Sequence, residues 1–580
     1  MPAVAATVIH HAARPRPPAA VPAAALTAGE SIRSLLGGAA VLQQTPGESI
    51  TLRVTLDLAE HRYLRDHYIY FPATEHNNQG DLITVVPLTC SLELLCEAAA
   101  LIDPSAKVVG ARNIEIFRPL QVVENEAPPV VQLVAARYAE GEVKASVRDD
   151  KTGSVFSQMI IRTARAFPAA PVLEDFAFEK ARTPECPSGQ KIYELGHMFH
   201  GPSFQGIDRL EVMANNGLQA KLAILPNTGC IHSVPSPQFY LDPFLLDAAG
   251  QLVGYWPVEN TDQGYIMLPI KVAEVVKYCD APPAGTLINA RLYVRNVSQR
   301  TLRADYDLLL PDGRLWLRVT GWEDWRFYWP KRMLDFGRKT LNSLASDPVE
   351  SPALEAGGYD CVLMQPMSDH ERDPVLDENW SMTLLSRREV PEFKKLNPKQ
   401  KTERLFAWTT AKDAARYWIA KRHGRKLYPA DIELDPRPDG SAAVTGFWTA
   451  EVPAPQISIS YQNGWAAAVA GPEKSTLAVV APGEAVPEDC FLPDELDWLN
   501  RLPDPDDWKR RAVAAKKAAA RYLAPASAED CWQTLNIVKI DKHSGLIGIA
   551  DPGSAVNAED ALRAATARYE EYTIAVVMQP

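Results

Sequence analysis

The chain has no long apolar run, no paired cysteines and no surplus of basic residues. No apolar segment approaches the roughly 18 residues that a membrane-spanning helix needs, so we expect no membrane span. The eight cysteines form no CxxC pair, which favours free thiols in the reducing cytoplasm over disulfides or a zinc site. With a formal net charge of -12, the chain has no broad basic face for nucleic acid.

The length and composition are those of a multidomain globular protein. At 580 residues the chain is too long for one hydrophobic core, and we expect two or three domains. Residues 1–45 are rich in alanine and proline, and residues 14–18 interrupt the apolar stretch that a secretory signal would need. We therefore predict a flexible tail over residues 1–45.

Residues 46–330 show one order of predicted elements twice. An apolar stripe over residues 91–100 predicts a helix, and β-rich stretches with intervening turns follow it. A second predicted helix, over residues 239–253, is also followed by strands, two of which are joined by a hairpin at Pro311-Asp312-Gly313. A long helix wrapped by an antiparallel sheet, present twice in one chain, predicts an α+β domain made of two fused hotdog folds.

Three motifs in this region carry groups suited to acid/base chemistry. Residues 63–67 end in His67, residues 245–251 contain Asp247 and Gln251, and residues 199–206 form a Gly-Pro turn between aromatic residues that would suit a substrate entrance. A neutral imidazole can remove a proton near pH 7. A carboxylic acid donates a proton at that pH only if its pKa is raised, and the apolar neighbours of Asp247 predict such a rise.

These motifs resemble the dehydratase domain of polyketide and polyunsaturated fatty-acid synthases, and most closely the branch found in iterative enediyne-type synthases. Taken alone, each fragment is typical of a solvated surface; their order and spacing carry the resemblance. The family's Leu-x-Asp-His segment ends at His67 here, and its Asp-x-x-x-Gln motif matches Asp247 and Gln251. The family's Gly-Pro-x-Phe motif matches Gly201, Pro202 and Phe204.

The resemblance implies the removal of water from a 3-hydroxyacyl thioester. His67 would be the base and Asp247 the acid, while Gln251, four residues along the same helix, would hold the carboxyl group. A backbone N–H near residues 87–89, at the start of the first helix, would bind the thioester oxygen as charge develops on it.

Two departures from the family pattern bear on activity. The chain places His200 before Gly201-Pro202, where many relatives carry a tyrosine that contacts substrate. An insertion that includes residues 77–80 lengthens the loop after His67. Either change would alter substrate specificity or weaken the activity.

The remainder of the chain divides into a connector, residues 331–395, and a second domain, residues 396–580, whose pattern is α+β. This second domain resembles the phosphopantetheinyl transferase domain that follows the dehydratase in enediyne-type synthases. The resemblance rests on residues 404–416 and 427–432 and on Ser-x-Ser at residues 458–460.

The catalytic positions of that transferase family are changed here. Tyr461 stands in place of the histidine, residues 477–482 contain no carboxylate where the family has Gly-x-Asp, and Lys517 replaces the glutamate. Magnesium requires hard oxygen ligands, and a lysine in place of a carboxylate reverses the local charge. We therefore expect a transferase-like fold, inactive in transfer, that binds neither magnesium nor coenzyme A.

The sequence as a whole predicts a cytoplasmic dehydratase that acts on 3-hydroxyacyl chains attached to an acyl carrier protein through a phosphopantetheine arm. Dehydration itself needs no cofactor. No Asp-Ser-Leu carrier motif is present, so the carrier would lie on another chain, beside other synthase components. The resemblance also suggests a homodimer. Two alternatives stay open: a noncatalytic scaffold or carrier-docking protein, and an active phosphopantetheinyl transferase.

Overall fold

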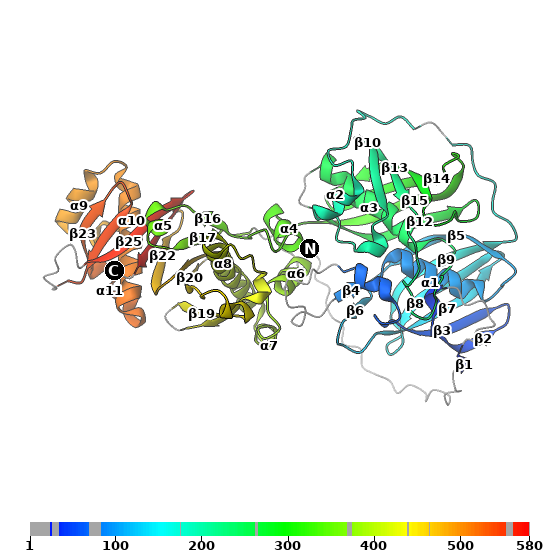
Figure 1. Ribbon diagram of the computed structural model, residues 1–580, viewed down its shortest axis with the longest axis horizontal. Coiled ribbons are helices and arrows are strands. Elements are labelled where there is room, and N and C mark those ends of the chain that lie inside the picture. The colour runs from blue at the N-terminus through cyan, green and yellow to red at the C-terminus, as the bar shows by residue number, and fades with distance from the viewer. Residues whose placement is uncertain are drawn as a thin grey trace.

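A computed structural model describes residues 24–25, 34–68, 83–173, 176–261, 265–367, 374–437, 440–462, 464–552 and 561–578. Two lobes follow each other along the chain (Figure 1). The first lobe ends with strand β15 (Leu315–Tyr328), and the second begins with helix α4 (Lys331–Arg338). No helix in the described ranges is long and apolar enough to cross a membrane.

One antiparallel sheet forms the frame of the first lobe. In its described part it has 13 strands. Their spatial order is β1 (Ala24–Ala25), β2 (Ala40–Thr45), β3 (Ser49–Thr55), β7 (Val130–Ala139), β8 (Glu142–Asp149), β9 (Val155–Ala164), β5 (Lys107–Ile116), β12 (Tyr265–Lys277), β15, β14 (Thr301–Leu309), β13 (Leu287–Val297), β11 (Gly217–Ala223) and β10 (Ile207–Ala214). A separate small ladder pairs β4 (Ile83–Val85) with β6 (Gln121–Val123).

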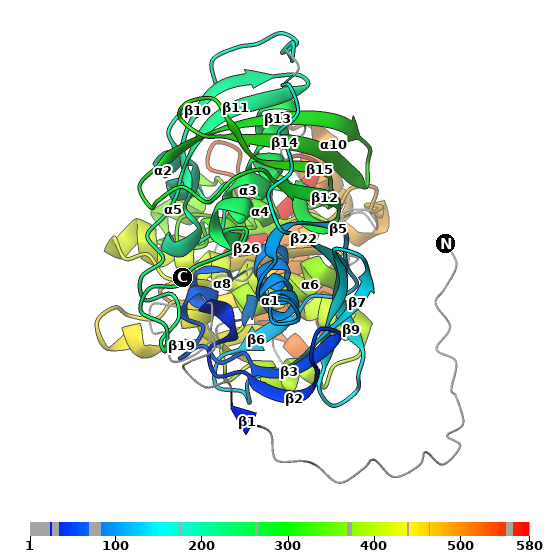
Figure 2. The ribbon, with the colours of Figure 1, turned by 90° about the vertical axis from the view of Figure 1, so that its right-hand side faces the viewer.

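The pairing of β5 with β12 joins two half-sheets, and each half-sheet covers one long helix. Helix α1 (Leu88–Ala100) contacts β3, β5, β7, β8 and β9, whereas α3 (Pro243–Asn260) contacts strands β10 to β14. Figure 2 shows the strands of the two half-sheets arranged around these helices. The two helices also contact each other. The predicted hotdog fold is confirmed, once in each half.

The sequences of the two central helices explain the burial of α1 and the start of α3. Every residue of α1 is buried: most are leucine, alanine or cysteine, and the carboxylates of Glu93 and Glu97 accept backbone N–H groups. Helix α3 begins where the Asp242 side chain accepts a hydrogen bond from the N–H of Leu245 and where Pro243 occupies the first helical position. The start of α3 therefore lies where local sequence favours it.

The sheet begins earlier in the chain than predicted. A short helix, η1 (Ser34–Leu36), and strand β2 belong to the lobe, so a flexible tail that reaches residue 45 is wrong for residues 34–45. Leu35 and Leu36 are buried, and their N–H groups donate to the carboxylate of Glu97 in α1. A single apolar pair after an alanine-rich stretch has no periodicity that would reveal this anchor. Residues 1–23 and 26–33 lie outside the described ranges.

The second lobe consists of two halves with the same topology, a repeat that the sequence did not reveal. In the first half, β17 (Asp360–Met364) precedes α8 (Pro398–His423) and four strands: β18 (Glu433–Pro436), β19 (Ser441–Thr445), β20 (Gln456–Gln462) and β21 (Trp465–Gly471). In the second, β22 (Ser475–Val480) precedes α10 (Pro505–Leu523) and four strands: β23 (Asn536–Asp541), β24 (Leu546–Ala550), β25 (Leu562–Tyr569) and β26 (Tyr572–Met578). In both, the first strand pairs with the last of these four.

Side chains alternate so that the two sheets of this lobe face each other. On β21, Ala466 and Ala468 pack in the core under α8, whereas Ala467 and Val469 pack against the other half. On β26, Val577 likewise faces the core under α10, and its neighbours face the first half. The lobe is therefore layered as helix, sheet, sheet and helix.

A buried ion pair recurs at the same place in each half. Lys412 on α8 donates to Glu389 at 2.6 Å, and Lys516 on α10 donates to Glu495 at 2.8 Å. Each glutamate also accepts two backbone N–H groups: those of Ser386 and Leu434 for the first, and those of Leu492 and Ile537 for the second. Matching contacts at matching positions strengthen the assignment of an internal repeat.

Residues 331–395 belong to the second lobe and are not a connector. They contain α4, β16 (Asp347–Val349), α5 (Pro352–Ala356), β17, α6 (Pro374–Leu384) and α7 (Val390–Lys394). All of β17 is buried, and the strand pairs with β16 on one side and β21 on the other. A short strand that is apolar on both faces lacks the alternation by which an exposed strand is recognised.

The remaining short helices lie between the strands and long helices along the chain. In the first lobe these are η2 (Arg62–Asp66), α2 (Gly189–Glu194) and η3 (Pro202–Phe204). In the second they are η5 (Pro429–Asp431), η6 (Phe447–Ala450), η7 (Glu488–Cys490), α9 (Pro493–Asn500), η8 (Pro525–Ser527), α11 (Ala528–Cys531) and η9 (Trp532–Thr534). Of these, η2 and η3 position the site described next.

Candidate functional site

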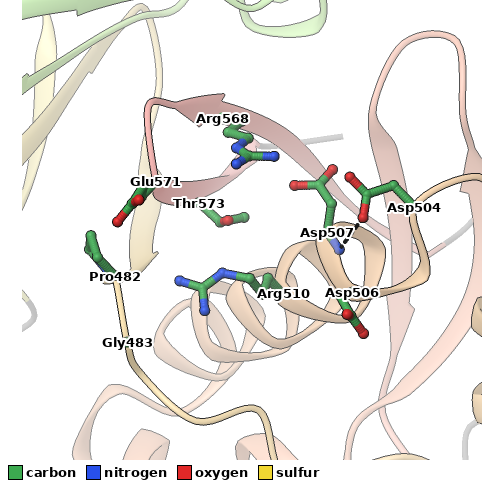
Figure 3. Close-up of a pocket in the computed structure, with 9 residues that line it drawn as sticks. All are labelled: Pro482, Gly483, Asp504, Asp506, Asp507, Arg510, Arg568, Glu571 and Thr573. Atoms are coloured by element: carbon green, nitrogen blue, oxygen red, sulfur yellow. Dashed lines mark hydrogen bonds between the residues drawn. The ribbon is translucent and has the colours of Figure 1, made fainter.

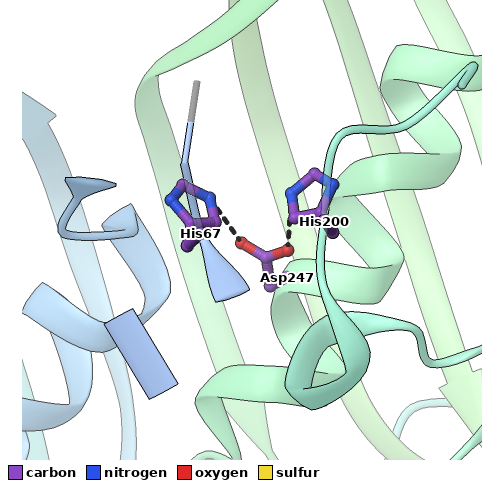
Figure 4. Close-up of side chains that lie close together, drawn as sticks. All are labelled: His67, His200 and Asp247. Carbon is purple, nitrogen blue, oxygen red and sulfur yellow. Dashed lines mark ion pairs between the residues drawn. The ribbon is translucent and has the colours of Figure 1, made fainter. Parts of the chain in front are cut away.

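His67, His200 and Asp247 come together where the two halves of the first lobe meet (Figure 4). His67 follows η2 in the first half, whereas His200 precedes η3 and Asp247 lies on α3, both in the second half. Nε2 of His67 lies 3.8 Å from Oδ2 of Asp247, and Nε2 of His200 lies 3.2 Å from Oδ1. All three side chains are at most 12% exposed. Folding thus brings the sequence-predicted His67 and Asp247 to one place.

The backbone of Val85 determines which nitrogen of His67 is free. Nδ1 of His67 lies 2.7 Å from the carbonyl oxygen of Val85, which only accepts hydrogen bonds, so Nδ1 carries the proton. The lone pair of Nε2 therefore faces Asp247. Burial lowers the pKa of His67 to about 4, although the Asp247 carboxylate acts in the opposite direction. The imidazole is neutral at pH 7 and has the form that a base requires.

The pKa of Asp247 is lowered, not raised as the sequence predicted. Burial does act to raise it, but the nearby imidazoles of His200 and His67 and the amide of Gln251 outweigh that effect. Gln251 Nε2 donates to Oδ1 at 2.8 Å, beside the contact from His200. The prediction considered only the apolar neighbours on the helix and missed groups that the fold brings in from elsewhere.

Tyr193 on α2 is a member of this network that sequence reasoning missed. Its hydroxyl donates to Oε1 of Gln251 at 2.8 Å and accepts the N–H of Ile207 at 3.2 Å. Gln251 Nε2 donates in turn to Asp247 and to the carbonyl oxygen of Phe204. Both ends of the Gln251 amide are therefore held. Nothing in the sequence near Tyr193 signals this contact, which spans 58 residues.

The Gly-Pro turn connects the two halves through Asp66. The N–H of Gly201 donates to the backbone carbonyl of Asp66 at 2.7 Å, and the N–H of Ser203 donates to its carboxylate at 2.9 Å. A Cβ at Gly201 would lie 2.5 Å from Oδ1 of Asp66, so only glycine fits without a shift. Pro202 begins η3. Besides its predicted place near an entrance, the turn holds His67 and His200 in one frame.

Aromatic rings enclose the imidazole of His67. The ring of Phe204 is fully buried, with its centroid 5.2 Å from that of His67 and 5.0 Å from that of Phe244. Phe199 stacks on His200 with centroids 4.0 Å apart. A cavity of about 180 Å³ beside the turn is lined by Asp66, Ser203, Phe244 and residues of the neighbouring segments. The predicted loop insertion at residues 77–80 lies outside the described ranges.

The start of α1 lies close to His67. The N–H of Val85 donates to the backbone carbonyl of His67, and Pro87 precedes the first residue of the helix. The hydroxyl of Thr89, in the first turn, is buried and has no hydrogen-bond partner among the described residues. The region predicted to bind the thioester oxygen thus follows directly after the strand residue that contacts His67, and its role stays a prediction.

The positions singled out in the second lobe lie along β20, β22 and α10. Lys517 pairs with Glu484 at 2.5 Å. Arg521 contacts the hydroxyl of Ser460, the neighbour of Tyr461, at 3.3 Å. A separate cavity of about 360 Å³ lies at the start of α10 and is lined by acidic and basic residues (Figure 3). Of the positions singled out for the transferase, it includes Pro482, the last residue of the stretch 477–482.

Three of the charged residues that line this cavity make structural contacts. The side chain of Asp504 accepts the N–H of Asp507 and so caps α10. Arg510 donates to the backbone carbonyls of Glu484 and Ala481, at 3.1 and 2.6 Å. The guanidinium of Arg510 therefore holds the loop after β22 against α10.

Comparison with known proteins gives the following matches. Residues 177–323 match the family model of the polyketide synthase dehydratase N-terminal domain. The chain is 22% identical over 242 residues to one of the chains of the polyunsaturated fatty acid synthase of Thraustochytrium sp.. That match spans 40% of this chain and 8% of the much longer synthase chain.

Solved structures give matches at lower identity. The dehydratase domain of a mycocerosic acid synthase-like polyketide synthase has 19% identity and a TM-score of 0.38, covering 51% of this chain and 97% of the other. A trans-AT polyketide synthase dehydratase domain from Brevibacillus brevis has 21% identity and a TM-score of 0.36, covering 49% and 96%.

The family match lies in the second half of the first lobe, and it contains His200 and Asp247. The curated relative is a polyunsaturated fatty acid synthase, as the motif resemblance implied. The first lobe is therefore a dehydratase domain of the polyketide and polyunsaturated fatty-acid synthase kind.

Proposed function

We propose that the first lobe removes water from a 3-hydroxyacyl thioester, carried on the phosphopantetheine arm of an acyl carrier protein, and forms the trans-2-enoyl thioester. The observation that carries this proposal is the approach of His67 Nε2 to the Asp247 carboxylate, 3.8 Å apart, with both side chains at most 12% exposed. A base and an acid on opposite sides of one site are what the elimination of water needs.

In the proposed reaction, Nε2 of His67 removes the proton from the carbon next to the thioester carbonyl. The hydrogen bond from Nδ1 to Val85 fixes the ring and its tautomer. Because the pKa of His67 is about 4, the lone pair is available throughout the neutral range. Backbone N–H groups in the first turn of α1 would stabilise the negative charge that develops on the thioester oxygen.

Asp247 would give its proton to the departing hydroxyl group, which leaves as water. The lowered pKa of Asp247 means that the carboxylate must first acquire a proton. Nε2 of His200 lies 3.2 Å from Oδ1 and is placed to pass a proton to it. After each turnover His67 holds one proton and Asp247 lacks one, and transfer from Nε2 to the carboxylate restores both. A single proton thus serves repeated cycles.

The partners belong to the same proposal. The acyl carrier protein would lie on another chain of a cytoplasmic synthase, and a homodimer follows from the family resemblance alone. The similarity to one chain of a fatty acid synthase supports action beside other synthase components. The dehydration as written consumes no cofactor.

For the second lobe we propose a phosphopantetheinyl transferase-like scaffold that docks the carrier protein and lacks magnesium-dependent transfer. Its duplicated halves and the Lys517–Glu484 pair support this reading, because a metal-binding carboxylate is replaced by a paired lysine. Mass spectrometry of an apo carrier protein, incubated with this protein, coenzyme A and magnesium, tests it. A gain of the pantetheine arm would instead establish an active transferase.

The dehydration is tested with a 3-hydroxyacyl carrier protein and mass spectrometry of the product. We expect His67→Ala and Asp247→Asn each to lower turnover by about 10²- to 10⁴-fold. His232→Gln, an exposed histidine outside the site, is the matched control and should turn over like the wild type. Equal turnover in all four proteins would refute the assigned pair. Carrier binding without any turnover would favour the noncatalytic scaffold.

A further inference from the structure

Three side chains of the dehydratase site converge in a way that acid/base chemistry alone does not require. Among the residues that the structure describes, His67, His200 and Asp247 form the one group of three or more potential metal ligands whose donor atoms all lie within 4.8 Å of one another. We propose that this group binds a divalent transition metal, Zn²⁺ above all, and that the bound metal reversibly inhibits the enzyme. The inhibitory part rests on the proposed function; the binding part does not.

The distances suit a zinc ion. Bonds of about 2.0–2.1 Å in a tetrahedral arrangement place ligand atoms roughly 3.3 Å apart. Nε2 of His200 and Oδ1 of Asp247 are 3.2 Å apart, and Nε2 of His67 and Oδ2 are 3.8 Å apart. The two imidazoles approach different oxygens of Asp247, and the three ligand atoms lie within 4.8 Å of one another, so the side chains would draw closer together as all three bind one ion.

The donor types select the metal. Two imidazole nitrogens with one carboxylate oxygen suit zinc and its transition-metal neighbours better than magnesium or calcium, which prefer oxygen ligands. Three protein ligands also leave a fourth position open for water. One carboxylate offsets only one of the two positive charges of the ion, so an anionic fourth ligand could offset the other.

Hydrogen bonds already hold two of the ligands from behind. Nδ1 of His67 donates to Val85, which directs the Nε2 lone pair toward Asp247. Gln251 donates to Asp247 and is itself held by Tyr193. Such contacts behind a metal ligand fix its orientation and commonly change metal affinity by about 10- to 100-fold.

Metal binding and dehydration would exclude each other. The Nε2 lone pair of His67 that would bind the ion is the same lone pair that would accept the substrate proton. Asp247 would lose its role in the same step, because an oxygen bound to the ion cannot carry the proton for the leaving hydroxyl. Inhibition is therefore expected to be competitive with the acyl substrate and to be reversed by a chelator.

Titration of the full chain with Zn²⁺ by calorimetry, and with Co²⁺ by visible absorption, tests the binding without any substrate. We expect one equivalent to bind, with absorption bands typical of tetrahedral cobalt. His200→Gln and His67→Gln should each weaken binding by at least about 100-fold. His232→Gln, which removes an exposed histidine, is the control and should bind as the wild type does. Melting curves without metal show whether each variant is folded.

The outcomes separate the two proposals. No zinc binding by the wild type, or equal binding by wild type and His200→Gln, overturns the metal site even if the enzyme dehydrates its substrate. One-equivalent binding lost in both variants supports the site even if no dehydration is found. If the enzyme dehydrates, zinc should raise the apparent KM and a chelator should restore it; an unchanged rate with the metal bound would refute inhibition.

Discussion

The carboxylate of Asp66 accepts hydrogen bonds from both the backbone N–H and the hydroxyl of Ser203, 137 residues further along the chain. Asp66 immediately precedes His67, and Ser203 lies just after the His200-Gly201-Pro202 turn. This contact therefore fixes the spacing between the two imidazoles of the site. A carboxylate that accepts two hydrogen bonds is also a stronger anchor than a neutral acceptor.

Removal of the Asp66 carboxylate should disturb both stability and activity. We expect Asp66→Ala to lower the free energy of unfolding of the first lobe by about 1–3 kcal/mol, because two donors of Ser203 lose their acceptor. Turnover should fall with it as His67 and His200 lose their fixed spacing. Denaturation followed by tryptophan fluorescence, together with the dehydration assay, measures both.

Ser203→Ala is the matched control for that change. It removes the hydroxyl contact but keeps the backbone one, and should cost about 0.5–1.5 kcal/mol with little effect on turnover. Wild-type turnover in a folded Asp66→Ala protein would show that the contact is not needed for the site.

The lowered pKa of His67 predicts how stability depends on pH. Between about pH 6.5 and about 4 the unfolded chain binds a proton at this histidine and the folded protein does not, so the folded state loses stability as the pH falls through that window. The loss should amount to about 3 kcal/mol at pH 4. His67→Gln should remove this contribution, so the wild type should lose stability relative to the variant as the pH falls.

Urea denaturation of both proteins at several pH values across that window provides the measurement. The comparison is made as a difference because buried acids such as Asp324, whose pKa is raised to about 7, titrate in the opposite sense in both proteins. Parallel curves for wild type and His67→Gln would contradict the assigned burial of the imidazole.

The hydroxyl of Tyr193 should support catalysis through Gln251. Tyr193→Phe leaves the ring in place but frees Oε1 of Gln251 and the N–H of Ile207. We expect about a 10-fold fall in kcat with little change in KM, and a stability loss of about 1–2 kcal/mol from the unpaired groups. Steady-state kinetics separates the two constants.

Gln251→Glu provides the second variant for this network. It keeps the size of the side chain but replaces the donor to Asp247 with a carboxyl group, so it should lower kcat more than Tyr193→Phe does. If Tyr193→Phe changed only stability, the hydroxyl would have a structural role alone.

The repeated ion pair predicts matched effects in the two halves of the second lobe. Lys516→Met leaves Glu495 buried without its partner and should destabilise the second half by about 3–5 kcal/mol, and Lys412→Met should do the same to the first. Hydrogen exchange along α10 and α8 locates each effect. Dehydration should be unchanged, because the first lobe has its own core.

The same experiment tests whether the two lobes are independent units. If Lys516→Met accelerated exchange throughout the first lobe, the two lobes would not be independent units. Replacing both members of the pair by apolar residues should restore part of the stability, since no buried charge is then left alone.

The amino-acid sequence by itself determined the class of the first lobe and led to the reaction proposed for it. Helix and strand periodicities are local, so residues 91–100 and 239–253 could be recognised as the two central helices. The motifs at His67, Gly201 and Asp247 are also local, and they led to the dehydratase family that the comparison confirmed. Their catalytic roles stay predictions.

Only the tertiary structure decided the electrostatics of the site and the plan of the second lobe. The pKa of Asp247 depends on the imidazoles of His200 and His67, which are close in space and distant in the chain, so the flanking residues alone predicted the wrong direction. The repeat in the second lobe lies in the order of strand pairing and in the burial of Lys412 and Lys516. Strand pairing depends on contacts between distant residues, and no local pattern encodes it.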